Sequence, residues 1–147
     1  QHVHKVIRPG LARGVVVICE RFTDSSLAYQ GFASGNDPEL ILKMNTFATG
    51  GLVPNLTFLL DLKPDQGWCR VQERSGSEGT DRIEAKGLIF QEKVRQGYLQ
   101  LAAAEAGRFC LLNGSDRTKE EIHQQIWTLF LEKFPFIPVG NEGKGGS

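Results

Sequence analysis

Residues 56–65 have the sequence Leu-Thr-Phe-Leu-Leu-Asp-Leu-Lys-Pro-Asp, an apolar run that ends in an acid and is followed by a helix-starting Lys-Pro-Asp. A continuous apolar run is typical of a strand covered by helices on both faces. Residues 15–19 and 109–112 form two further runs of this kind. Long segments with helical periodicity separate the runs, as parallel βαβ connections require. The sequence therefore predicts an α/β fold with a parallel sheet.

Capping residues mark the first long helix. Asp37-Pro38-Glu39 supplies an N-cap, a proline at the first helical position and an acid in the first turn. Gly50-Gly51 is predicted to end this helix. The apolar residues of the segment recur on one helical face, which is therefore predicted to point inward: Leu40, Ile41, Met44, Phe47 and Ala48.

Three more helices are predicted further along the chain. A short one begins at Lys63-Pro64-Asp65, and a long one runs from about Glu84 to Ala106. The inward residues of the long helix are predicted to be Leu88, Val94, Tyr98, Leu101 and Ala102. Thr118 and Glu121 form a capping box for a last helix, which carries Ile122, Ile126 and Leu129.

Composition limits the class of protein. The 147 residues carry 17 basic and 17 acidic side chains, so the net charge is zero, and 40% of residues are apolar. This balance excludes a disordered chain and argues against a duplex-DNA binder. Apolar runs are too short to cross a bilayer, which takes about 20 residues. Three cysteines without paired spacing favour reduced thiols in the cytoplasm, and Cys19 is predicted to lie in the core.

Ligands of open α/β sheets bind beyond the carboxyl ends of the strands, where this chain places polar residues. Glu20 and Arg21 follow the first run, Asp61 follows the second and Asn113-Gly-Ser115 follows the third. A guanidinium suits phosphate oxygens, and an acid can hold Mg²⁺ through water. A simple ion pair at the strand end is the alternative for Glu20 and Arg21. Asp61 can equally be a helix cap or a partner of Lys63.

Residues 70–82 are polar and rich in glycine, and they contain three arginines, Arg70, Arg74 and Arg82. Two interpretations remain open for this stretch. It is either a solvated surface loop or a mobile lid whose arginines bind anions.

Residues 20–31, Glu-Arg-Phe-Thr-Asp-Ser-Ser-Leu-Ala-Tyr-Gln-Gly, resemble the thymidylate kinase signature D-R-[YF]-x-x-S-x-x-A-Y-Q-G. Further segments resemble this family in the same order, namely residues 48–57, 59–61, 81–84 and 94–102. The resemblance covers about residues 1–126. It implies an incomplete three-layer α/β/α fold of the P-loop NTPase (nucleotide kinase) type. The implied activity is phosphoryl transfer from ATP to dTMP with Mg²⁺, which gives dTDP.

The resemblance also implies roles on the acceptor side. Arg21 is expected to grip the 5′-phosphate of dTMP, and Glu20 to hold Mg²⁺ through water. The family has Asp at the position of Glu20, and the extra methylene moves the carboxylate. Tyr29 is expected against the sugar, and the thymine end is expected to meet Ser25, Ser26 and Gln30. Helix capping is the alternative role for Ser25 and Ser26.

On the donor side, the resemblance implies that Arg70, Arg74 and Arg82 close over the ATP phosphates. Arg74 is expected to stabilise the transferring phosphoryl group, because positioned positive charge is the main catalytic device in this chemistry. A salt bridge with Asp81 or Glu84 is the alternative for Arg82.

No phosphate-binding loop ending in Gly-Lys-Ser/Thr precedes Glu20. The chain is therefore expected to be the C-terminal two-thirds of a thymidylate kinase. Residues 1–134 are predicted to form the domain, with a lid at about residues 70–82, and residues 135–147 a Pro/Gly-rich tail. The alternatives are a non-catalytic nucleotide-binding fragment and a kinase for another deoxynucleoside monophosphate. The family resemblance further implies a cytosolic homodimer. No nucleic-acid partner and no membrane partner are expected, from the charge balance and the short apolar runs.

Overall fold

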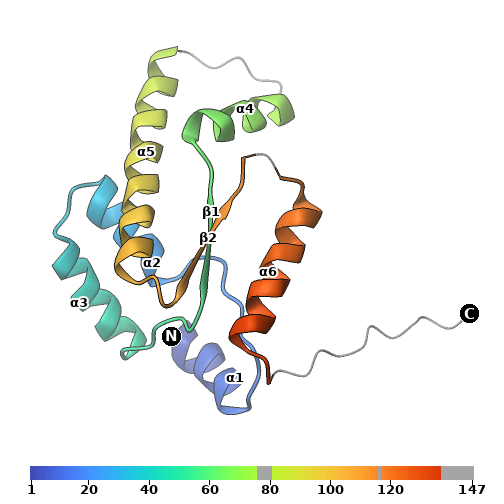
Figure 1. Cartoon of the computed structure of the whole chain (residues 1–147). Helices are drawn as coiled ribbons and strands as arrows, with labels where there is room; N and C mark the ends of the chain where they lie inside the picture. Colours follow the sequence, from blue (N-terminus) through green and yellow to red (C-terminus); the bar gives the residue numbers. More distant parts are fainter. Residues whose placement is uncertain (76–80, 116, 137–147) are drawn as a thin grey trace, which may run out of the picture. The chain divides into compact units, whose positions relative to one another are not determined.

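A computed structural model describes residues 1–75, 81–115 and 117–136, with side chains left out of the description for residues 70–86. Its elements in chain order are η1 (Val3–Ile7), α1 (Arg8–Ala12), α2 (Thr23–Ser26), η2 (Leu27–Ala33), α3 (Pro38–Thr49), β1 (Thr57–Asp61), α4 (Pro64–Ser75), α5 (Asp81–Ala104), β2 (Phe109–Asn113) and α6 (Lys119–Lys133), where η marks a π-helical segment. Figure 1 shows this order along the chain. The chain divides into two compact units, Gln1–Ser115 and Asp116–Ser147. Each unit is described separately.

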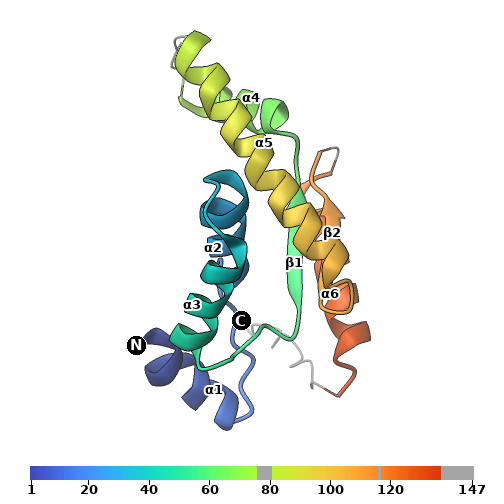
Figure 2. The ribbon, with the colours of Figure 1, turned by 90° about the vertical axis from the view of Figure 1, so that its left-hand side faces the viewer.

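The sheet of the first unit is parallel, which confirms the predicted α/β fold. β1 pairs with β2 in register from Thr57 opposite Phe109 to Asp61 opposite Asn113. α4 and α5 form the connection between the two strands, and α5 lies across the sheet (Figure 2). Leu112 is fully buried, but Leu60 and Leu111 are half exposed. Burial of every residue on both faces was expected and is wrong, because the described helices of this unit do not cover the sheet completely and leave these two leucines open to solvent.

Residues 15–19 do not form the expected strand. They lie outside any helix or strand, and Ile18 is 91% exposed. Cys19 is also exposed, so its predicted place in the core is wrong. An apolar segment becomes a strand only where a neighbouring backbone pairs with it, and the described residues provide no ladder partner for this one.

The ends of α3 are where the capping residues predict them. The Asp37 carboxylate accepts a hydrogen bond from the Glu39 backbone N–H at 2.9 Å, and Gly50 closes the helix with a φ of 63°. The predicted inward face is wrong except for Ile41, which is buried. The other four residues of that face are exposed: Leu40, Met44, Phe47 and Ala48. Periodicity predicts that a helix has an apolar face, but the neighbouring elements decide whether that face is covered.

Helices extend into the region for which a loop or a lid was predicted. α4 begins at Pro64 as expected and continues to Ser75, while α5 begins at Asp81. The loop interpretation of residues 70–75 and 81–82 is therefore wrong at the level of the backbone. Residues 65–75 include only one glycine and several good helix formers, which explains the helix. Residues 76–80 lie outside the described residues.

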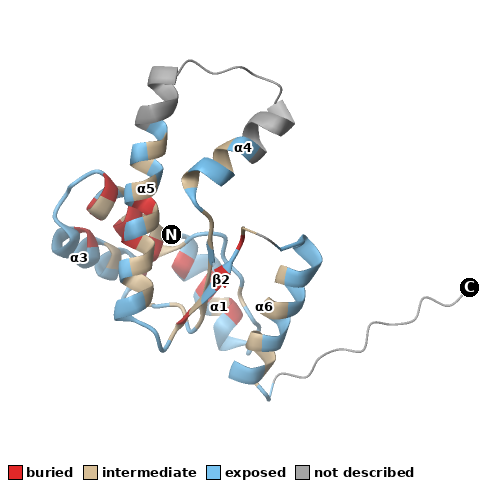
Figure 3. Ribbon diagram, turned by 45° about the horizontal axis from the view of Figure 1, so that its top comes forward, coloured by how far each residue is buried: buried red, intermediate tan, exposed pale blue. Residues whose placement is uncertain are grey.

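The hydrophobic core of the first unit lies where α5 packs against η2. Ala28, Ala33 and Val94 are its buried centre, and Figure 3 marks the buried residues in red. The two elements approach so closely at Gly97 that an added Cβ atom would lie 2.8 Å from the Cβ atom of Phe32. This close packing fixes η2, and the residues that precede it, against α5.

The second unit contains α6. Thr118 and Glu121 form the predicted capping box, with the Glu121 backbone N–H donating to the Thr118 hydroxyl at 3.2 Å. The rings of Trp127 and Phe130 stack with centroids 5.7 Å apart. Among the described residues of the chain, none of the helices is long and apolar enough to span a membrane.

Candidate functional site

Arg21 has an unusual backbone conformation. Its φ is 63°, in the left-handed region that costs a residue with a side chain about 1–2 kcal/mol. The side chain is exposed, and its guanidinium carbon lies 5.2 Å from the centroid of the Tyr29 ring. Backbone strain at an exposed arginine is a feature of ligand-binding sites, because packing alone does not require it.

Ser25, Tyr29 and Tyr98 lie together beside Arg21. The hydroxyl oxygens of Ser25 and Tyr98 are 2.7 Å apart and share a hydrogen bond. The Tyr98 ring meets the Tyr29 ring edge-on, with centroids 6.4 Å apart. Burial raises the pKa of Tyr98, so its phenol stays protonated at neutral pH. Through the side chain of Tyr98, α5 thus contacts two residues of the 20–31 motif, Ser25 and Tyr29.

The two serines do not cap α2. The N-cap position of that helix is Phe22, and no side chain makes a capping hydrogen bond there. Helix capping was one interpretation of Ser25 and Ser26, and the geometry contradicts it. Ser25 is engaged by Tyr98 instead, and Ser26 is half-buried.

A cavity of about 550 Å³ lies between the end of β1, α4 and α5. Tyr29 and Tyr98 line it together with Trp68, Asp61 and Arg95. Its volume is within the range of small-molecule sites, about 300–1,000 Å³. The indole N–H of Trp68 is buried without a hydrogen-bond partner in the part of the chain that is described. The cavity therefore combines largely apolar walls with a charged end.

Asp61 and Arg95 form that charged end. The guanidinium donates two hydrogen bonds to the carboxylate, at 2.6 and 2.8 Å. The hydrogen bond to Asp61 raises the pKa of Arg95 above its ordinary value. Arg95 is thus the partner of Asp61, and neither of the roles expected for Asp61, helix cap or partner of Lys63, is observed.

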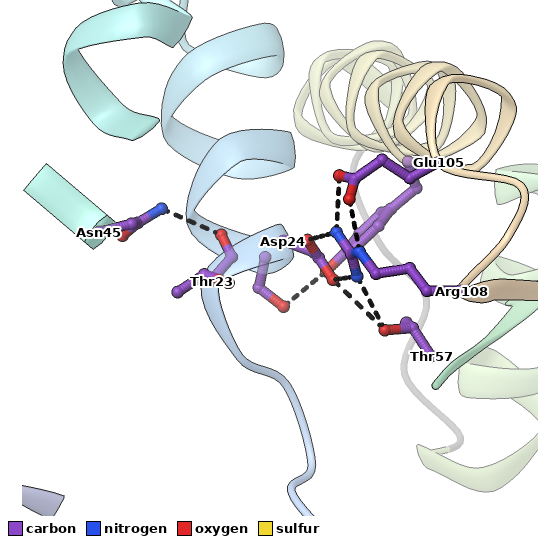
Figure 4. Close-up of polar contacts among 8 residues, drawn as sticks. Thr23, Asp24, Asn45, Thr57, Glu105 and Arg108 are labelled. Atoms are coloured by element: carbon purple, nitrogen blue, oxygen red, sulfur yellow. Dashed lines mark hydrogen bonds and ion pairs between the residues drawn. The ribbon is translucent and has the colours of Figure 1, made fainter. Parts of the chain in front are cut away.

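A second ion network fixes α2 to the sheet (Figure 4). The Arg108 guanidinium donates to both oxygens of the buried Asp24, at 2.7 and 2.8 Å, and to both oxygens of Glu105, at 2.6 and 2.7 Å. It also donates to the Thr57 hydroxyl at 3.1 Å. The hydrogen bonds from Arg108 lower the pKa of Glu105. The network joins the residue three positions after Arg21 to the start of β1 and to the turn before β2.

The structure thus places Arg21 against Tyr29, and Ser25 and Tyr29 both against Tyr98, while the roles of the three motif residues toward a nucleotide stay predictions. Glu20 and Gln30 are exposed, and Gln30 accepts a hydrogen bond from the Asn36 amide with its backbone carbonyl. The side chains of the predicted lid arginines, Arg70, Arg74 and Arg82, lie outside the described residues. Their expected positions over a nucleotide therefore stay predictions.

Glu20 offers a single carboxylate to a metal. Across the described ranges, no three His, Cys, Asp or Glu side chains come together as metal ligands. A lone exposed carboxylate suits Mg²⁺, which keeps several waters and takes one or two protein carboxylates besides phosphate oxygens.

Sequence reasoning missed Asp24, Arg95, Arg108 and Tyr98 as site-forming residues. A signal existed for Arg108, because Glu105 precedes it by three residues, a spacing at which side chains meet. Tyr98 carried an ambiguous signal, since an aromatic residue on the apolar face of a helix is usually only a core residue. The partner of Asp24 was not predictable, because 84 positions separate it from Arg108.

Known proteins are similar to this chain in both sequence and fold. Residues 1–126 match the family model described as thymidylate kinase. The thymidylate kinase of Synechococcus sp. (strain JA-2-3B'a(2-13)) is 43% identical over 142 residues, which are 97% of this chain and 66% of the relative. The thymidylate kinase of Geobacter sulfurreducens is 47% identical over 119 residues, or 79% of this chain and 56% of the relative.

The crystal structure of thymidylate kinase from Ehrlichia chaffeensis superimposes with a TM-score of 0.64 at 27% identity, over 88% of this chain and 58% of that one. This match confirms the expected nucleotide-kinase type of α/β fold. The chain spans between 56% and 66% of the length of these three relatives. The family model and the relatives agree with the ordered motifs, and the chain belongs to the thymidylate kinase family.

Proposed function

We propose that this chain serves phosphoryl transfer from ATP to dTMP, giving dTDP, and that its described part supplies the acceptor site. One observation carries the proposal. The strained Arg21 lies over Tyr29, and Tyr29 lines a cavity of about 550 Å³ together with Tyr98, which holds Ser25. A guanidinium beside an aromatic-walled cavity matches a ligand with a phosphate at one end and a base at the other.

Each of the acceptor residues binds a different part of the nucleotide. Arg21 binds the 5′-phosphate and fixes its oxygens toward the donor. Tyr29 packs against the deoxyribose, where its ring leaves no room for a 2′-hydroxyl. The thymine end meets Ser25, Ser26 and Gln30. Their hydroxyl and amide groups can pair with the carbonyl and N–H groups of the base.

The donor side of the proposal rests on the family resemblance. Arg70, Arg74 and Arg82 hold the ATP phosphates, and Arg74 stabilises the phosphoryl group as it moves. Glu20 holds Mg²⁺ through water. When bound, Mg²⁺ neutralises the charge that develops on the phosphate oxygens. The protein's own part is to position the two phosphates and to place positive charge around them.

Calorimetric titration with dTMP tests the acceptor site. We expect dTMP to bind more tightly than dUMP, dCMP, dGMP or the ribonucleotide. Arg21→Ala should weaken dTMP binding at least tenfold, because a charge-assisted phosphate contact is lost. The matched control is Arg13→Ala, which removes another exposed arginine of the same unit and should leave the affinity unchanged. Equal affinities for Arg21→Ala and the wild type would refute the role of Arg21.

A coupled assay of ADP release with ATP, Mg²⁺ and dTMP separates the alternatives. Turnover supports the kinase proposal for this chain. Binding of dTMP without turnover supports a non-catalytic nucleotide-binding fragment. Tighter binding of another deoxynucleoside monophosphate than of dTMP supports a kinase of different acceptor specificity.

The proposal includes a homodimer in the cytoplasm. Leu40, Met44 and Phe47 form an exposed apolar face on α3, and contiguous apolar surface is common at subunit interfaces. The three cysteines are free, as is usual in a reducing compartment. Sedimentation equilibrium measures the assembly, and a purely monomeric chain at micromolar concentration contradicts it.

A further inference from the structure

Tyr98 is the link between α5 and the acceptor residues. It makes two different contacts with the 20–31 motif from a single side chain: its hydroxyl shares a hydrogen bond with Ser25, and its ring forms a T-shaped pair with that of Tyr29. The hydroxyl contact joins residues 73 positions apart in sequence. The N-caps of α2 and η2 have no side-chain capping hydrogen bond, so capping does not hold this segment in place of the Tyr98 contact.

The backbone around Tyr98 is closely packed. The neighbouring Gly97 allows α5 to approach Phe32, and Val94 is 4% exposed one turn earlier. The position of Tyr98 is therefore set by the core and not by the ligand. A side chain fixed in this way can hold more mobile neighbours in a binding geometry before the ligand arrives.

We propose that Tyr98 is a positioning residue of the acceptor site, acting through Ser25. Its hydroxyl holds Ser25 by a hydrogen bond, and its ring contacts that of Tyr29, which lines the cavity and over which Arg21 lies. The inference rests on the proposed function only for the identity of the ligand. The geometry that it assigns to Tyr98 exists in the ligand-free chain.

The first test therefore uses the free protein. Hydrogen–deuterium exchange of residues 22–28 is compared between the wild type and Tyr98→Phe, which loses only the hydroxyl. Faster exchange in this segment, with residues 57–61 unchanged, supports positioning by Tyr98. Identical exchange in residues 22–28 overturns the inference, whatever the ligand of the site is.

The second test is a double-mutant cycle on dTMP affinity. Tyr98→Phe and Ser25→Ala should each raise the Kd for dTMP about fivefold, as expected for the loss of one hydrogen bond. Because Tyr98 acts through Ser25, the double variant should be no weaker than Ser25→Ala alone. A further fivefold loss in the double variant overturns action through Ser25. The control Thr46→Val removes a comparable hydroxyl within α3 and should leave the Kd unchanged.

Tryptophan fluorescence measures the binding of dTMP without the need for turnover. Trp68 lines the same cavity as Tyr98, and Trp127 belongs to the other unit. In a Trp127→Phe background the emission reports Trp68 alone, so a titration measures ligand entry into the cavity. A wild-type chain that does not bind dTMP refutes the proposed function, while the exchange experiment still decides the role of Tyr98.

Discussion

At the scale of single residues, Arg21 is expected to lower the stability of the fold while it serves ligand binding. Its φ of 63° suits glycine, and replacing arginine with glycine removes strain of about 1–2 kcal/mol. The greater freedom of glycine in the unfolded chain offsets about 0.5–1 kcal/mol of this gain. We therefore expect Arg21→Gly to raise the free energy of unfolding by up to about 1 kcal/mol in urea titrations. The same variant should lose dTMP binding.

Arg21→Ala separates the two effects. Alanine also lacks the guanidinium, but its Cβ atom keeps the strained backbone, so binding should fall without a gain in stability. If the glycine and alanine variants unfold at the same urea concentration, the strain at position 21 does not contribute to stability. The charge of Arg21, and not backbone strain, then accounts for its role in binding.

At the scale of elements, the packing of α5 against η2 decides where the acceptor residues lie. Gly97→Ala should raise helix propensity by about 1 kcal/mol, but the new Cβ atom would lie 2.8 Å from the Phe32 Cβ atom. Overpacking of this kind costs about 1–3 kcal/mol. We expect a net loss of stability and, because Tyr98 is the next residue, a weaker affinity for dTMP.

Gly87 provides the matched control on the same helix. Among the described residues, none has an atom within 4 Å of an added Cβ atom at this position. Gly87→Ala should therefore stabilise the chain by up to about 1 kcal/mol in urea titrations. An increase in stability for both variants would show that α5 and η2 separate without cost, which contradicts close packing as the device that fixes Tyr98.

At the scale of the whole molecule, the parts predicted from sequence are those that depend on local signals. The caps at Asp37 and Thr118 and the strands that begin at Thr57 and Phe109 could be predicted, whereas the roles of Arg21, Ser25 and Tyr29 in a site stay predictions. The capping residues satisfy backbone groups of their own helix, and a motif within 12 residues keeps its members close. Such features need no knowledge of distant partners.

The predictions that were wrong concern features that depend on residues far away in the sequence. Residues 15–19 have strand composition, and α3 has an apolar face, but pairing and covering come from other elements. The partners Asp61–Arg95 and Asp24–Arg108 are likewise set by tertiary structure. The division into a domain at residues 1–134 and a tail stays a prediction.

The Arg108 network connects residues of the first unit that are far apart in sequence. Asp24 and Arg108 are 7% and 13% exposed, so removing the arginine leaves a buried carboxylate without its main partner. Breaking a buried pair in this way costs about 3–5 kcal/mol. We expect Arg108→Met, which keeps an apolar stem, to lower the free energy of unfolding by that amount in urea titrations. The total free energy of unfolding of a folded domain is only about 5–15 kcal/mol, so this loss is a large part of its stability.

Two further variants make the result interpretable. Arg108→Lys keeps the charge but cannot form two paired hydrogen bonds with each carboxylate, so its loss should be intermediate and its fold retained. Lys43→Met breaks the exposed pair with Glu39, whose side chains are 78% and 83% exposed, and should change stability by less than about 0.5 kcal/mol. A cost for Arg108→Met no larger than that of Lys43→Met would mean that the network does not hold α2 to the sheet. The position of Arg21 would then depend on the packing of α5 against η2 alone.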